Sequence, residues 1–158
     1  MSDVISAGQS APDFSMPAND DKTISLSDYE GRYLVLYFYP KDSTPGCTTE
    51  AREFTAFKAD FAALNAEIVG VSRDSVRKHE NFISNQELGI TLGSDEDGKV
   101  CEDYGVWVEK KNYGRTYMGI ARSTFLIGPD GTVLEIWRNV RVKGHVEAVL
   151  KSLQAHSS

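Results

Sequence analysis

The feature that most constrains the fold is the run YLVLYFY, which occupies residues 33–39. Every side chain in it is aliphatic or aromatic, and no charged or amide residue interrupts it. A strand with one face in water alternates apolar and polar residues, whereas a strand covered on both faces is apolar throughout. The run therefore predicts a central strand in a sheet that has helices on both sides.

A helix pattern follows this strand. After Pro40 and a short polar loop, apolar residues recur every three or four positions, which predicts an amphipathic helix over residues 45–64. Thr44 is placed to cap the N-terminus of this helix, and Pro45 suits its first turn. The strand thus leads directly into a helix through a polar loop.

The rest of the chain continues the alternation of strand and helix. We expect, in order, a strand at 67–72, a helix at 75–87, a short strand at 90–93, a short helix at 98–104, a strand at 123–127, a Pro-Asp-Gly turn at 128–131, a strand at 132–138 and a C-terminal amphipathic helix that His145 opens. The first two strands should pair in parallel through a right-handed crossover. This order resembles a thioredoxin-like α/β fold, a three-layer α/β/α sandwich with a central mixed sheet and an N-terminal extension. We expect one domain over residues 1–158, with a frayed tail at about 155–158.

Composition and charge argue against several functional classes. The 158 residues include 17 Lys and Arg against 23 Asp and Glu, a net charge of −6, which is unfavourable for nucleic acid as a partner. The longest apolar run falls far short of the roughly 20 residues that a membrane span needs. The N-terminal segment MSDVISAGQS lacks the basic and apolar regions of a signal peptide. We therefore expect a cytoplasmic protein with no membrane partner.

Cys47 is the strongest candidate for chemistry. It lies just beyond the predicted central strand, in the first turn of the following helix, where open α/β folds place their functional groups. Unpaired N–H groups at a helix N-terminus stabilise an anion, so a thiol there is more readily a thiolate. The alternative is a small residue packed under the loop, which the polar setting between Thr44 and Thr48 disfavours.

The residues around Cys47 resemble the active-site signature of the peroxiredoxins, a proline, three residues, a threonine, two residues and a cysteine. The longer string FYPKDSTPGCTTEAREF is similar to the branch called bacterioferritin comigratory protein, or PrxQ. Further similar segments are GQSAPDFSMP, GVSRDS, SDEDGKV, YGVW and ARSTFLIGPDGTV. Together they extend over about residues 8–140, most of the chain.

The resemblance implies a thiol-dependent peroxidase that reduces hydrogen peroxide and organic hydroperoxides through a sulfenic acid on Cys47. It implies that Thr44 contributes a hydroxyl, that Arg122 places a fixed charge at the sulfur and the departing oxygen, and that Pro40 shields the sulfur. From the residues alone, Thr44 could instead cap the helix, and Arg122 could be a solvent-exposed residue at the start of a strand. Glu50 matches a position often acidic in this branch, or it is a first-turn carboxylate favoured by the helix dipole.

The sequence departs from the PrxQ pattern at the resolving cysteine. Arg52 occupies one usual position for it, and the helix expected at 75–87, the other usual location, contains no cysteine. Cys101 is then the remaining candidate, and packing as a small core residue beside Val100 and Tyr104 is its alternative role. We therefore expect recycling by an external thiol, from thioredoxin, glutaredoxin or a small molecule.

Other functional classes are less well supported. His79, His145 and His156 form no metal-ligand spacing, so we expect neither a metal nor another cofactor. The chain also lacks the CxxC motif of a thioredoxin-like reductase. A non-enzymatic redox sensor or holdase that uses Cys47 oxidation is the alternative function, and we expect a monomer or weak homodimer.

Overall fold

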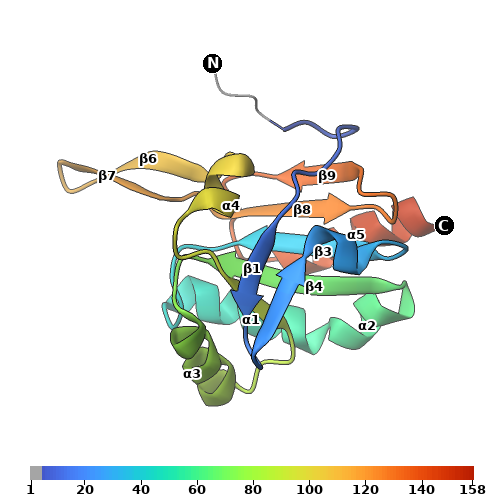
Figure 1. The fold of residues 1–158 in the computed structure, drawn as a ribbon, viewed down its shortest axis with the longest axis horizontal. Coiled ribbons are helices and arrows are strands. Elements are labelled where there is room, and N and C mark those ends of the chain that lie inside the picture. Colours follow the sequence, from blue (N-terminus) through green and yellow to red (C-terminus); the bar gives the residue numbers. More distant parts are fainter. Residues whose placement is uncertain (1–4) are drawn as a thin grey trace.

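The computed structural model describes residues 5–158, and a mixed β-sheet forms its centre (Figure 1). Within this part of the chain the sheet has seven strands in the order β2-β1-β5-β4-β3-β8-β9. Their bounds are β1 Ser15–Ala18, β2 Lys22–Ser25, β3 Tyr33–Phe38, β4 Ala66–Ser72, β5 Thr91–Ser94, β8 Ser123–Ile127 and β9 Val133–Trp137. Strands β3, β4 and β5 pair in parallel, and the remaining pairs are antiparallel. The expected central mixed sheet is confirmed.

Helices cover both faces of this sheet, as the α/β expectation requires. Four of them pack on one face, namely α1 Pro45–Ala56, α2 Lys58–Ala63, α3 Val76–Gln86 and α5 His145–Ser157. The short helix α4 Lys99–Asp103 packs on the other face, where the 3-10 helix η1 Leu26–Tyr29 also contributes. We call these two faces the α1 side and the α4 side of the sheet.

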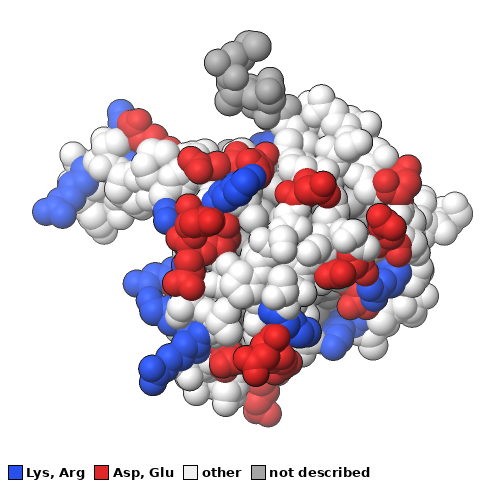
Figure 2. Space-filling model, in the orientation of Figure 1, with Lys and Arg blue, Asp and Glu red and all other residues white. Residues whose placement is uncertain are grey.

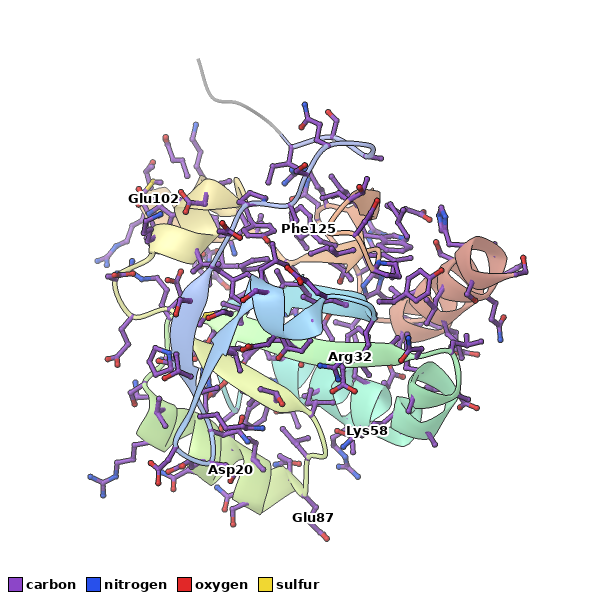
Figure 3. The ribbon with its side chains drawn as sticks, turned by 45° about the vertical axis from the view of Figure 1, so that its right-hand side comes forward. Asp20, Arg32, Lys58, Glu87, Glu102 and Phe125 are labelled. Carbon is purple, nitrogen blue, oxygen red and sulfur yellow. The ribbon has the colours of Figure 1, made fainter. Side chains whose placement is uncertain are left out.

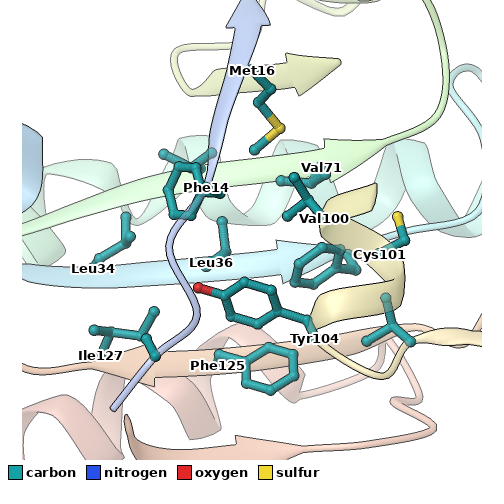
Figure 4. Packing of buried hydrophobic residues seen from close by; sticks show 14 of the residues in the cluster. Phe14, Met16, Leu34, Leu36, Val71, Val100, Cys101, Tyr104, Phe125 and Ile127 are labelled. Carbon is teal, nitrogen blue, oxygen red and sulfur yellow. The ribbon is translucent and has the colours of Figure 1, made fainter. Parts of the chain in front are cut away.

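Strand β3 divides the core into these two sides, because successive side chains of a strand point to opposite faces. Leu34, Leu36 and Phe38 belong to the cluster on the α4 side, which Figure 4 shows packed around Tyr104 and Phe125. The alternate residues Val35 and Tyr37, together with Tyr39 just after β3, belong to the cluster on the α1 side. No residue from 34 to 39 is more than 1% exposed, so the central strand is covered on both faces as its sequence predicts.

Most charged side chains lie at the surface, and Asp42, Glu50 and Asp95 are buried exceptions. In Figure 3 Phe125 points into the interior, whereas Lys58, Glu87 and Glu102 project from the periphery. On the face drawn in Figure 2, acidic and basic side chains are interspersed. Among the described residues, no helix has both the length and the apolar character that crossing a membrane requires.

Two expectations about the helices are wrong. The helix expected over 45–64 is broken at Phe57, where φ is −96° and ψ is 5°, and α2 starts afresh from the Phe57 carbonyl. No glycine or proline marks this break. The tail expected to fray at 155–158 instead continues α5 to Ser157, and the Tyr33 hydroxyl donates a hydrogen bond to the His156 carbonyl.

Two hairpins were not expected from the sequence. Strands β1 and β2 pair into the first, which adds an edge to the sheet. Strands β6 Trp107–Asn112 and β7 Arg115–Ile120 form the second, which projects from the body of the molecule (Figure 1). Residues 1–4 of the expected domain lie outside the described part of the chain.

Candidate active site

Cys47 is the third residue of α1, immediately beyond the loop that follows β3. Thr44 has the extended backbone of an N-cap, and the first helical hydrogen bond runs from the Thr48 N–H to the Thr44 carbonyl at 2.8 Å. The Cys47 sulfur therefore lies in the first turn, where unpaired N–H groups carry the positive end of the helix dipole. Cys47 is only 1% exposed. The predicted location of Cys47 at a helix start is confirmed.

Arg122 reaches this sulfur from the segment between β7 and β8. Its Nη2 donates to Cys47 Sγ at 3.4 Å, and its Nη1 donates to Glu50 Oε1 at 2.6 Å. The Arg122 carbonyl accepts from the Val140 N–H at 2.9 Å, which fixes the backbone on the other side. One guanidinium thus bridges the thiol and a carboxylate with separate nitrogens, which the planar fork of arginine permits. Arg122 is not a solvated strand residue.

Glu50 lies one turn after Cys47 on α1 and is completely buried. Burial raises the pKa of Glu50 to about 7, although the neighbouring Arg122 charge acts to lower it. Its Oε2 has no hydrogen-bond partner among the described residues. Burial lowers the pKa of Arg122, but Glu50 and Cys47 outweigh it, and the net shift is upward. Glu50 is therefore a buried partner of Arg122 and not a solvated first-turn carboxylate.

The other two predicted residues frame the loop without a hydrogen bond to the sulfur. The Thr44 hydroxyl donates to the Lys41 carbonyl at 2.8 Å and makes no side-chain cap, so Thr44 caps α1 through its backbone alone. Pro40 is exposed and borders a surface cavity of about 460 Å³. Lys41, Arg73, Glu96 and residues of the β6–β7 hairpin complete the cavity wall.

The hairpin also brings a cation that the sequence did not reveal. Burial lowers the pKa of Lys110, the charge of Arg122 lowers it further, and Cys47 opposes both. Lys110 on β6 lines the same cavity as Pro40, within reach of the charges of Cys47 and Arg122. Its placement depends on the unexpected hairpin, and no spacing to Cys47 in the sequence signals it.

Cys101 lies on the other side of the sheet from Cys47. It is fully buried on α4 within the α4-side cluster (Figure 4), whereas Cys47 belongs to the α1-side cluster. Burial, reinforced by Asp95, raises the pKa of the Cys101 thiol. Within residues 5–158 both cysteines are unpaired.

Within the described residues, the hydrogen bonds of His79 and His145 go to partners other than the Cys47 sulfur. His79 pairs with Asp42, and His145 Nε2 pairs with Thr124 Oγ1 at 2.7 Å. No group of three or more His, Cys, Asp or Glu within the described residues is arranged to hold a metal ion. The chemistry that the site can perform therefore centres on the thiol, with a fixed cation beside it.

Comparison with known proteins identifies the family. The model of the AhpC/TSA family matches residues 7–136. Peroxiredoxin Bcp of Bacillus subtilis is 49% identical over 150 residues, with 95% of this chain and 96% of the relative covered. Peroxiredoxin Bcp of Xanthomonas campestris is 50% identical over 133 residues, with 84% and 83% covered.

Solved structures agree in fold. A cysteine-to-serine mutant of PrxQ from Xylella fastidiosa has a TM-score of 0.94 at 41% identity, with 99% of both chains covered. The Xanthomonas campestris bacterioferritin comigratory protein, whose trapped-intermediate and ligand complexes concern its alkyl peroxide reduction activity, has a TM-score of 0.88 at 45% identity, with 92% of both chains covered. The fold is thus the thioredoxin-like peroxiredoxin fold. The chain belongs to the AhpC/TSA family and, within it, to the Bcp/PrxQ peroxiredoxins, which are thiol-dependent peroxidases.

Proposed function

We propose that Cys47 is the residue through which this peroxidase reduces hydrogen peroxide and organic hydroperoxides. The observation that carries the proposal is the 3.4 Å hydrogen bond from Arg122 Nη2 to Cys47 Sγ at the N-terminus of α1. Both features place positive charge beside the sulfur, where it stabilises negative charge that develops there during attack on a peroxide.

The reaction then proceeds in two balanced halves. The Cys47 thiolate attacks the terminal oxygen of the hydroperoxide, the O–O bond breaks, and with one proton the products are Cys47–SOH and water or an alcohol. A reductant thiol next attacks Cys47–SOH, releases water and leaves a mixed disulfide. A second thiol reduces this disulfide and restores Cys47.

Each neighbouring group has a role in the first half-reaction. Arg122 stabilises the thiolate and the negative charge that develops on the departing oxygen, since a donor already in place needs no reorganisation. Glu50 orients Arg122 through their 2.6 Å hydrogen bond. Thr44, whose hydroxyl proton is engaged by Lys41, keeps an oxygen lone pair available to accept from the peroxide. Pro40 lies at the rim and shields the loop from water.

We propose that an external thiol, from thioredoxin, glutaredoxin or a small molecule, completes the cycle. Cys101 is a poor resolving residue because it lies across the sheet from Cys47 and its pKa is raised by burial. A disulfide requires Cα atoms within about 7 Å. Forming one here would displace α1, α4 or both from the sheet.

We further propose a cellular location and an oligomeric state for the protein. Two unpaired cysteines suit the reducing environment of the cytoplasm. The net charge of −6 is unfavourable for binding nucleic acid or an anionic membrane surface. We propose a single-domain monomer or weak homodimer that meets its reductant transiently.

The test is peroxide consumption with excess dithiothreitol or a thioredoxin system. Cys47→Ser should abolish it, because a serine hydroxyl is barely ionised at neutral pH, and Cys101→Ser should retain it. Sustained consumption that survives in Cys47→Ser would refute the assignment. A single stoichiometric turnover of the wild type would instead indicate a redox sensor or holdase.

A further inference from the structure

A buried pair of ionisable side chains lies next to the active site but takes no part in the proposed reaction. His79 on α3 is fully buried, and the Asp42 side chain, in the loop between β3 and α1, is only 4% exposed. The two meet at 2.6 Å between His79 Nδ1 and Asp42 Oδ2. His79 Nε2 lies 2.9 Å from the Gly93 carbonyl, to which it donates. A contact as short as 2.6 Å requires one proton between the ring and the carboxylate.

Further hydrogen bonds attach the same loop to the start of α3. The Tyr39 hydroxyl donates to Asp42 Oδ1 at 2.5 Å, and the Asp42 N–H donates to Asp74 Oδ2 at 2.8 Å. Asp74 Oδ2 also accepts from the Ser72 hydroxyl at 2.8 Å. Asp42 therefore links the end of β3 to α3 through its backbone and both carboxylate oxygens.

The loop has a conformation that its own residues do not favour. Ser43 has a φ of 65°, in the left-handed region that L-residues with a Cβ rarely adopt. Such a backbone persists where surrounding contacts hold it. Asp42, the residue before Ser43, provides those contacts, and Thr44, the residue after it, is the N-cap of the helix that carries Cys47.

The two halves of the cycle make opposite demands on this loop. With the loop in place, Arg122 contacts a sulfur whose residue is 1% exposed. A reductant thiol must bring its own sulfur, with the bulky group that carries it, to bonding distance, about 2.05 Å, and this needs a wider opening to the sulfur than a small peroxide does. The peroxide step therefore needs the loop closed, and attack by a bulky thiol needs it open.

We propose that Asp42 and His79 are positioning residues that hold the loop closed for the peroxide step and thereby limit its opening for the thiol step. The proposal rests on the proposed role of Cys47. It places the control of the cycle in a hydrogen-bonded pair that does not touch the reacting atoms.

The test measures the two half-reactions separately in Asp42→Asn and His79→Gln. Stopped-flow mixing of reduced protein with hydrogen peroxide gives the first rate, and mixing of Cys47–SOH with dithiothreitol gives the second. We expect the first to fall by about tenfold and the second to rise severalfold. Alkylation of reduced Cys47 by iodoacetamide, followed by peptide mapping, should also accelerate. The double variant should resemble the single variants, since each removes the same interaction.

Leu153→Ala is the matched control. Leu153 is fully buried on the same side of the sheet, in the last turns of α5, near the end of the sheet where β3 begins. Its truncation lowers the melting temperature without touching the loop, so the two rates should stay close to wild type. If the loop variants change both rates in the same direction, or change neither, the positioning role is refuted.

Tyr39→Phe keeps the test decisive if a variant of Asp42 or His79 does not fold. It removes only the hydroxyl that donates to Asp42. The peroxide step should again slow and the thiol step should again accelerate, each by a smaller factor than in the Asp42 and His79 variants. Relative to wild type, hydrogen exchange in this variant should accelerate more at the Asp42 amide than at amides in the centre of β3. Equal protection changes at both positions would contradict the proposal. Peroxidase activity that survives in Cys47→Ser would refute the proposed function instead, so the two failures are distinguishable.

Discussion

Replacing Arg122 by lysine tests the central contact of the site with little change in charge. Arginine contacts Glu50 and Cys47 through two different nitrogens, at 2.6 Å and 3.4 Å. A lysine ammonium is a single point on a flexible stem and cannot reproduce the two-pronged geometry. Glu50 is completely buried and needs a partner, so the ammonium should settle on Glu50 and withdraw from the sulfur.

The magnitude follows from the distance. A unit charge 3.4 Å from a thiolate contributes about 5 kcal/mol at an effective dielectric constant of 20. Part of this remains when the ammonium stays at Glu50, which leaves a loss of about 3 kcal/mol, the usual cost of removing one well-placed donor. That corresponds to roughly a hundredfold slower reaction with peroxide.

Stopped-flow fluorescence measures this rate, with Trp107 and Trp137 as the intrinsic reporters. The matched control is Arg138→Lys. Arg138 is another partly buried arginine, but it lies 5.5 Å from the centroid of the Phe125 ring in the α4-side cluster. This control should react with peroxide at close to the wild-type rate.

A result within about threefold of wild type for Arg122→Lys would refute the reasoning, because a difference of that size is less than 1 kcal/mol. Equal slowing in both lysine variants would also contradict it. Arg122 would then act through general stability of the fold and not through Cys47.

Three further outcomes are expected. The pKa of Glu50 is raised to about 7, so the contribution of Glu50 to stability should fall as pH rises from about 4.5 to 7. Burial lowers the pKa of His145 to about 4, so the contribution of His145 to stability should fall as pH drops from about 6.5 to 4. Urea titrations of Glu50→Gln and His145→Gln against wild type should show differences of opposite slope, up to about 3 kcal/mol each. Gly46→Ala places a Cβ 3.1 Å from Arg122 Nη2 and should slow the peroxide step while the melting temperature is retained. Excess peroxide should convert Cys47 to sulfinic acid in both wild type and Cys101→Ser by intact mass, and a quantitative loss of two mass units in wild type would contradict this.

The central elements could be predicted because their patterns depend on burial. The run at 33–39 became β3, and the strand expected at 123–127 has those bounds in the structure. The turn expected at 128–131 is present, with the Gly131 N–H bonded to the Gly128 carbonyl at 2.9 Å. In each case side chains covered on both faces, or a turn with a glycine at positive φ, leave few alternatives.

The hairpin of β6 and β7 could not be predicted in the same way, because its strands bury little. Strand β6 has only partly buried and exposed residues, and β7 is exposed over its first four. Their turn has positive φ at both Tyr113 and Gly114, a geometry for which asparagine or aspartate before glycine is the usual signal. Because tyrosine stands before the glycine, the sequence does not carry this usual signal of a turn.

The residues of the candidate site also differ in how far a local sequence pattern predicts them. The positions of Cys47 and Thr44 follow from one local strand-loop-helix pattern. Cys47 and Arg122 are 75 positions apart in the chain, no local signal marks their contact, and only the resemblance indicated it. The burial of Glu50, the approach of Lys110 and the pair of Asp42 with His79 depend on how α3, the hairpin and the sheet pack together, which no short segment encodes.

The groups that we propose for both half-reactions meet at one end of β3, and this follows from the topology of the sheet. Strands β3 and β4 run in parallel, so α1 and α3 both begin at the same edge. The antiparallel neighbour β8 begins at that edge as well, which places Arg122 beside the first turn of α1. The helix dipole, the arginine and the loop anchor therefore converge on Cys47, whereas Cys101 on α4 lies beyond the sheet. The sheet that assembles this site thus separates the two cysteines, which supports the proposal that a thiol from outside regenerates Cys47.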